Sequence, residues 1–108
     1  MKPTILFGGT NRERLVAVAS AQAVSAALPE ADLWFWAPDG EVRIADAASL
    51  AAHQRPFEFD FAADGPVIGP IESALDRAAS EDRVLVLSLH GGAAENGELA
   101  ALCEARGV

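Results

Sequence analysis

Near its N-terminus the chain reads Thr4-Ile5-Leu6-Phe7-Gly8-Gly9, a short apolar run that ends in two glycines. Such a run predicts a buried strand that enters a tight turn. Residues 12–28 are good helix formers without glycine or proline, and Pro29 ends the pattern. Strand, glycine turn and helix in this order are typical of an open α/β sheet, in which ligands bind at the carboxyl ends of the strands.

The same order occurs again near the C-terminus. Residues 83–89 read Arg-Val-Leu-Val-Leu-Ser-Leu, which favours a strand buried on both faces of a parallel sheet. His90-Gly91-Gly92 ends this strand, and Asn96 begins a helix pattern that runs to residue 105. We therefore expect an α/β fold with an open, mostly parallel sheet flanked by helices, similar to a Rossmann fold.

Between these two units the sequence predicts a hairpin and one helix. Residues 32–37 and 41–45 read as strands joined by the turn Pro38-Asp39-Gly40, and residues 70–79 suit a helix. Residues 46–66 are irregular, except that Phe57, Phe59 and Phe61 alternate with acids as in an edge strand or a lid. Val67-Ile68 is too short a run to assign.

Composition limits the class of protein. With 108 residues, 51% of them hydrophobic, the chain suffices for one domain with its own core. A net charge of -8 argues against binding to nucleic acid or to an anionic membrane surface. There is neither a signal peptide nor an 18-residue apolar stretch, so we expect a cytoplasmic protein. The single cysteine, Cys103, fits a core position and allows no internal disulfide.

Two loops carry the candidate functional residues. Gly8 to Glu13 and His90 to Asn96 each follow a strand, so both are expected at the same edge of the sheet. Glycines 8, 9, 91 and 92 would let a ligand approach the backbone, and a helix N-terminus favours anions. The first loop is, however, neither G-x-G-x-x-G nor a P-loop. His53 and His90 have no partners at metal-ligand spacing, so no metal site is expected.

Each candidate side chain has a functional and a structural interpretation. Thr10-x-x-Glu13 matches a helix capping box, but the Glu13 carboxylate would also suit a ligand ammonium. His90 is either a structural histidine or a site residue at a strand end. Glu95 is either a site residue or an acid favoured by the helix dipole.

Together the two loops resemble one enzyme family. Residues 5–16, Ile-Leu-Phe-Gly-Gly-Thr-Asn-Arg-Glu-Arg-Leu-Val, look like the opening of D-alanine-D-alanine ligases, where the first strand runs into G-G-T-S-x-E-R-x-V-S. Residues 87–99, Leu-Ser-Leu-His-Gly-Gly-Ala-Ala-Glu-Asn-Gly-Glu-Leu, look like the family's A-L-H-G-x-x-G-E-D-G-T-L-Q-G. The order and separation of the motifs fit the family's N-terminal, pre-ATP-grasp domain.

The resemblance implies an activity and a role for three side chains. The family joins two D-alanines for peptidoglycan, using ATP to phosphorylate the first carboxylate before the second amine displaces the phosphate. Glu13 matches the carboxylate that holds the ammonium of the first D-alanine. His90 and Glu95 match residues that shape and hydrogen-bond the same site.

The sequence also departs from the family pattern. Ala17 stands where the family has serine, Ala94 where it has glycine, Asn96 where it has aspartate and Glu98 where it has threonine. Asn96 can still cap a helix, whereas Ala94 adds a Cβ that a positive φ would not tolerate. These departures bear on which substrate the site accepts.

The resemblance spans residues 1–108 but only the first third of such an enzyme. The central and C-terminal ATP-grasp domains lie outside this sequence, and its sole lysine is Lys2. We therefore expect a single substrate-binding domain that binds no cofactor itself, with ATP and magnesium bound by the missing domains. Phosphoryl transfer depends on cations and metal, so the chain alone is expected to be inactive.

The sequence is also compatible with two other functions. One is a free-standing α/β module that binds a small molecule or phosphate through its glycine loops. The other is a noncatalytic domain that forms a homodimer through the face of Phe57 to Phe61.

Overall fold

The fold is that of a computed structural model that describes residues 2–9, 14–54, 61–63 and 65–89. These residues form five strands and three helices. In chain order they are β1 (Lys2–Gly8), α1 (Arg14–Ala27), β2 (Asp32–Trp36), β3 (Glu41–Ala45), α2 (Ala47–Ala52), β4 (Val67–Pro70), α3 (Ile71–Ser80) and β5 (Arg83–Leu89).

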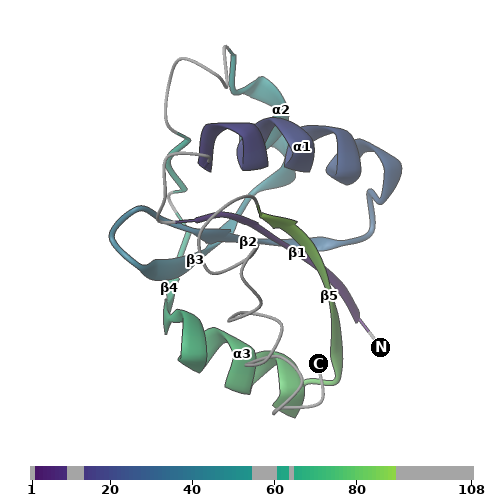
Figure 1. Ribbon diagram of the computed structural model, residues 1–108. Helices are drawn as coiled ribbons and strands as arrows, with labels where there is room; N and C mark the ends of the chain where they lie inside the picture. The colour runs from purple at the N-terminus through teal and green to yellow at the C-terminus, as the bar shows by residue number, and fades with distance from the viewer. Residues whose placement is uncertain (1, 10–13, 55–60, 64, 90–108) are drawn as a thin grey trace.

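The strands form one mixed sheet in the order β4-β3-β2-β1-β5. β1 is central and pairs in parallel with both β2 and β5. The predicted hairpin is confirmed: β3 turns back antiparallel to β2, and β4 is antiparallel to β3. Helices α1 and α2 cover one face and α3 covers the other, as Figure 1 shows. The expected α/β fold class is thus confirmed, but the sheet is mixed rather than mostly parallel, because two of its four pairings are antiparallel.

Alternating side chains of the central strands enter two cores. Ile5 and Phe7 of β1 point to the α1 face, and Leu6 between them points to the α3 face. Both faces are covered by helices, which explains why the strand is an unbroken apolar run. The core on the α1 face comprises Ile5, Phe7, Val18, Ala21, Leu33, Phe35, Ala37, Leu50 and Phe61. The core on the α3 face comprises Leu6, Trp34, Val42, Ala74, Leu75 and Ala78.

β5 differs from the expectation that it is buried on both faces. Its side chains Val84 and Leu87 are 40% and 45% exposed. The reason is its place in the sheet, because β5 is the outermost strand beside β1 among the residues described. The apolar run therefore predicted the strand correctly, but it did not predict that some of its side chains are exposed.

The short elements were not predicted, whereas the longer ones were. The helix expected over residues 70–79 is confirmed as α3, which is shifted by one residue at each end, so that Pro70 is its N-cap. Helix α2 has only six residues, and its N-cap is Asp46, whose carboxylate accepts a hydrogen bond from the backbone N–H of Ser49. The expected helix at 96–105, with Cys103, and the expected strand positions Phe57 and Phe59 lie outside the described residues.

Gly8 ends β1 in a conformation that only glycine adopts readily. Its φ is +97°, and a Cβ at this position would lie 2.6 Å from the carbonyl oxygen of Trp36 and 2.7 Å from the Phe35 ring. The next residue continues this close approach, since Gly9 N–H donates to the same Trp36 oxygen at 2.8 Å. The two glycines therefore let the chain turn tightly over the end of β2.

Replacing Gly8 by alanine tests this close approach, with Gly40→Ala as a matched control. Gly40 has a similar φ of +92°, but no atom lies within 4 Å of the added Cβ. We expect Gly40→Ala to lower the free energy of unfolding by about 1 kcal/mol through backbone strain, and Gly8→Ala by about 3 kcal/mol or more through strain plus overlap. Urea unfolding measures both values, and equal losses would contradict the packing argument.

Candidate functional site

The carboxyl ends of three parallel strands meet at one edge of the sheet. Gly8 pairs with Trp36 of β2 on one side and with Leu89 of β5 on the other. The chain segments that follow β1 and β5 therefore begin from directly paired residues. This is the edge at which ligands bind in open α/β sheets.

The structure describes only part of the site predicted from the sequence. Gly8 and Gly9 are described and buried. Glu13, His90, Glu95, Gly91 and Gly92 lie outside the described residues, and so do Ala94, Asn96 and Glu98. What the structure supplies is the framework beside them: Arg14 begins α1, and Leu89 ends β5.

Helix α1 is held to the end of β5 by a buried hydroxyl. Ser88 is 5% exposed, and its Oγ donates a hydrogen bond of 3.1 Å to the carbonyl oxygen of Ala17. Ala17 lies in the first turn of α1 and is fully buried. In Figure 1 the end of β5 accordingly lies beneath this helix. The sequence interpretation missed the role of Ser88, since nothing local to residue 88 indicates its partner.

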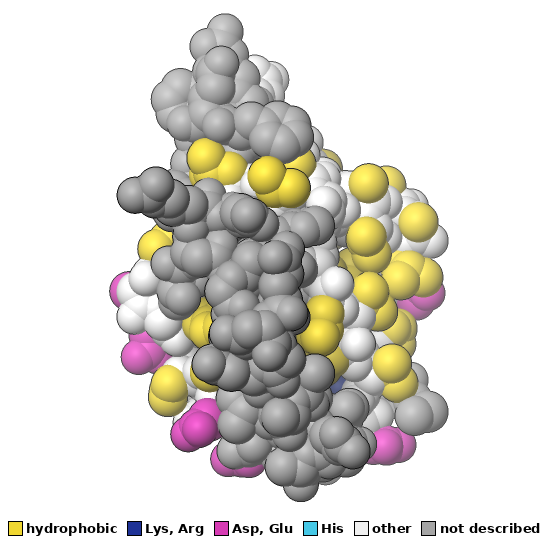
Figure 2. Space-filling model, in the orientation of Figure 1, with side chains coloured by type: hydrophobic (Ala, Val, Ile, Leu, Met, Phe, Trp, Pro, Cys, Tyr) yellow, Lys and Arg dark blue, Asp and Glu magenta, His cyan; other side chains and the backbone are white. Residues whose placement is uncertain are grey.

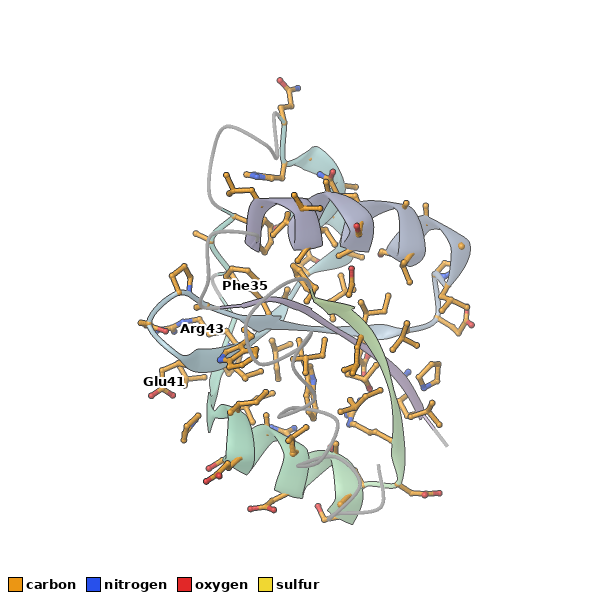
Figure 3. The ribbon with its side chains drawn as sticks, in the orientation of Figure 1. Phe35, Glu41 and Arg43 are labelled. Atoms are coloured by element: carbon orange, nitrogen blue, oxygen red, sulfur yellow. The ribbon has the colours of Figure 1, made fainter. Side chains whose placement is uncertain are left out.

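The β2–β3 hairpin borders the same edge and is internally bonded. Its turn is held by the Asp39 carboxylate, which accepts from Glu41 N–H at 2.9 Å and lies 3.8 Å from Arg43. The Trp36 indole N–H donates to the Gly40 carbonyl oxygen at 3.2 Å. Figure 3 shows Glu41 and Arg43 together at this end of the sheet, with Phe35 in the core beside them. These contacts give the hairpin a defined shape next to the glycine turn.

A charged cluster at the opposite, amino edge was also missed by the sequence interpretation. Arg83 donates to Asp32 Oδ2 at 2.7 Å, to Thr4 Oγ1 at 2.8 Å and to Glu81 Oε1 at 2.8 Å. Its guanidinium also lies 4.9 Å from the centre of the Trp34 ring. Lys2 adds a longer contact of 3.8 Å to Asp32. Three stretches of the chain, residues 2–4, 32–34 and 81–83, are thus joined at the edge opposite to the candidate site.

Protonation at this cluster follows from its hydrogen bonds. The bond from Arg83 holds the pKa of Glu81 below its ordinary value of 4.5, and the charge of Arg77 acts in the same direction. Burial lowers the pKa of Arg83, but the hydrogen bonds to Asp32 and Glu81 raise it further, so it lies above its ordinary value. Both groups are therefore charged at neutral pH. Figure 2 shows a face on which acidic side chains lie around the rim and little Lys or Arg surface is visible.

A cavity of about 310 Å³ lies elsewhere, where β3 joins α2. Its lining includes Ile44, Asp46, Ser49 and Phe61. Both the backbone N–H and the hydroxyl of Ser49 donate to the Asp46 carboxylate at 3.3 Å, so this acid acts as the cap of α2. The cavity lies at the end of β3 opposite to the hairpin and is separate from the candidate edge.

Neither a metal centre nor a membrane-spanning helix is present among residues 2–9, 14–54, 61–63 and 65–89. No three His, Cys, Asp or Glu side chains gather there in a way that would hold a metal ion. None of the helices described is long and apolar enough to cross a lipid bilayer. The histidine that is described, His53, packs its ring edge-on against Phe61 at 5.5 Å.

Comparison with known proteins gives a match at the level of fold. No protein-family model matches the chain, and no curated protein matches it in sequence. Among solved structures, it is similar to the D-alanine-D-alanine ligase from Helicobacter pylori, with a TM-score of 0.64 and 20% sequence identity. The similarity covers 98% of this chain and 34% of the ligase. The chain thus has the fold of one third of that enzyme, the same kind of enzyme that its two motifs resemble.

The amino-edge cluster predicts a pH dependence of stability. Because the pKa of Glu81 is lowered on folding, its ionised form stabilises the fold above pH 4.5, and this contribution is lost as the pH falls through the lowered pKa. We expect Glu81→Gln to lower the melting temperature at neutral pH, and the difference from wild type to shrink at pH ~3. Glu72→Gln, at an exposed position of α3, is the control. A difference in melting temperature that stays constant with pH would contradict the stabilising role of the ionised Glu81 carboxylate.

Proposed function

We propose that this chain is the N-terminal, substrate-binding domain of an ATP-dependent D-alanine-D-alanine ligase, a cytoplasmic enzyme of peptidoglycan precursor synthesis. The observation that carries the proposal is the fold, which is similar to that of a D-alanine-D-alanine ligase over 98% of the chain. The pairing of Gly8 with Leu89 supports it, because the two motif-bearing segments follow strands that end side by side.

In this proposal the first D-alanine is bound by side chains from both segments. Its ammonium requires an anion, and Glu13 supplies a carboxylate immediately before Arg14, the first residue of α1. A carboxylate near a helix N-terminus stays ionised and makes strong hydrogen bonds to a cation. His90, directly after β5, and Glu95 complete the hydrogen bonding and shape of the same site.

Two cations at the amino edge do not fit a nucleotide site. Lys2, the only lysine of the sequence, lies beside Asp32 at the amino edge, and Arg83 is bonded to the same carboxylate. Both charges are thus neutralised on the side of the sheet away from the glycine turn. Because phosphoryl transfer depends on free cations and metal at the phosphates, ATP and magnesium are assigned to the rest of the enzyme.

One contact disfavours the alternative of a phosphate-binding module. A glycine loop that holds phosphate does so with its backbone N–H groups. The N–H of Gly9 is already bonded to the Trp36 carbonyl oxygen at 2.8 Å. A donor is thereby removed from the position where a phosphate would need it, whereas recognition of an ammonium needs acceptors instead.

A substitution of Glu13 in the full-length gene product tests the proposed site. We expect Glu13→Gln to raise the KM for the first D-alanine at least about 30-fold, because an ion pair with the substrate ammonium is replaced by a neutral contact, while the KM for ATP is nearly unchanged. Glu30→Gln, which removes one carboxylate at an exposed turn before β2, is the matched control. An unaltered KM for the first D-alanine would contradict the binding role and leave Glu13 as a helix cap only.

A second measurement separates this domain from the other candidate functions. We expect residues 1–108 alone to release no ADP from ATP in the presence of magnesium and D-alanine, because the ATP-grasp domains, to which the proposal assigns ATP and magnesium, lie outside them. A coupled ADP assay checks this, with the full-length gene product as positive control. ADP release by the 108 residues would contradict the assignment. A dimer seen by sedimentation, together with a full-length product that does not respond to D-alanine, would favour the interaction domain.

A further inference from the structure

Two polar side chains, Thr4 and Ser88, are buried in the described part of the chain. Thr4 belongs to the cluster around Arg83 at the amino edge. Ser88 lies at the other end of the sheet, one residue before β5 ends. A buried hydroxyl in an otherwise apolar contact is unfavourable unless it is hydrogen-bonded. Its partner therefore indicates what the serine contributes.

Ser88 directs its hydroxyl out of the sheet and into α1. It pairs with Phe7, so its side chain lies on the α1 face together with Phe7 and Val86. The acceptor is the backbone oxygen of Ala17, 71 residues away in sequence. A carbonyl oxygen has two lone pairs, so the Ala17 oxygen can accept this bond in addition to the helical one. Helix and strand are thereby tied at one point by a directional contact, whereas apolar side chains alone allow sliding.

This tie, the hydrogen bond from Ser88 to Ala17, lies next to both motif-bearing segments. Ala17 is three residues after Arg14, the start of α1, and Ser88 is one residue before Leu89, the end of β5. A shift or rotation of α1 over β5 would change the separation of these two ends. A hydrogen bond at this contact restrains that separation, because its energy falls steeply as distance and angle change.

We propose that Ser88 is a positioning residue, whose hydroxyl sets the start of α1 relative to the end of β5 and so the geometry of the D-alanine site. The inference rests on the proposed function. The motifs add a second observation. The family pattern has serine at the position of Ala17 and, in A-L-H-G, alanine at the position of Ser88. In this chain the hydroxyl is on the strand side of the contact, at Ser88, and the helix side has alanine.

Kinetics of the full-length gene product test the positioning role. Ser88→Ala is expected to raise the KM for the first D-alanine about fivefold, the equivalent of one ordinary hydrogen bond, with the KM for ATP unchanged. Val86→Ala is the control, since Val86 packs on the same face of β5 but has no hydroxyl. It is expected to lower the melting temperature without changing the ratio of the two KM values. A wild-type KM for D-alanine in Ser88→Ala, or an equal rise in both KM values, would overturn the role.

The double variant Ala17→Ser/Ser88→Ala returns the hydroxyl to the helix side. We expect it to recover most of the affinity for D-alanine that Ser88→Ala loses, because a hydroxyl again occupies the contact. If the double variant is no better than Ser88→Ala, the proposed exchange of the hydroxyl between helix and strand is wrong.

A spectroscopic measurement separates this inference from the proposed function. The carbonyl ¹³C resonance of Ala17 is expected to shift in Ser88→Ala and to stay in place in Val86→Ala, because a carbonyl shift reports the loss of a hydrogen bond. If the resonance does not move, the tie is absent and the inference fails even where the enzyme uses D-alanine. If it moves but the wild-type protein does not use D-alanine, the proposed function fails and the tie stands.

Discussion

β1 is hydrogen-bonded to β2 on one side and to β5 on the other, and its side chains enter both cores. This double pairing determines where the other elements lie. The register that joins Lys2 to Arg83 brings the cation of β5 beside Asp32 at one edge. The same register joins Gly8 to Leu89 at the opposite edge. One strand of seven residues thus separates a charged structural edge from the edge proposed to bind substrate.

Most of this framework was predictable because short, local sequence patterns indicate its elements. An apolar run followed by Gly8-Gly9 marks a buried strand that turns, and Pro38-Asp39-Gly40 marks a hairpin; both are confirmed. Helix α2 and strand β4 were not predicted, because elements of six and four residues leave too little periodicity to recognise. The exposure of Leu87 was missed because a sequence does not tell which strand lies at the edge of a sheet.

The candidate site, too, was predictable where it depends on local sequence and was missed where it depends on distant partners. The expectation that two loops share an edge follows from a general rule of parallel sheets, and the paired ends of β1 and β5 agree with it. The roles of Arg83 and Ser88 depend instead on partners 51 and 71 residues away. Nothing near residue 83 or 88 in the sequence indicates such partners. Glu13, His90 and Glu95 remain predictions, made from motifs and from the position of their neighbours.

The setting of Trp34 has a practical consequence. Its indole is 1% exposed beneath α3, with the guanidinium carbons of Arg77 and Arg83 at 5.8 and 4.9 Å from the ring centre. A buried indole emits fluorescence at shorter wavelengths than a hydrated one, and its neighbours here come from β5 and from α3. The second tryptophan, Trp36, is only partly buried. The emission spectrum of the unlabelled protein thus contains a native optical signal for the docking of α3 onto the sheet.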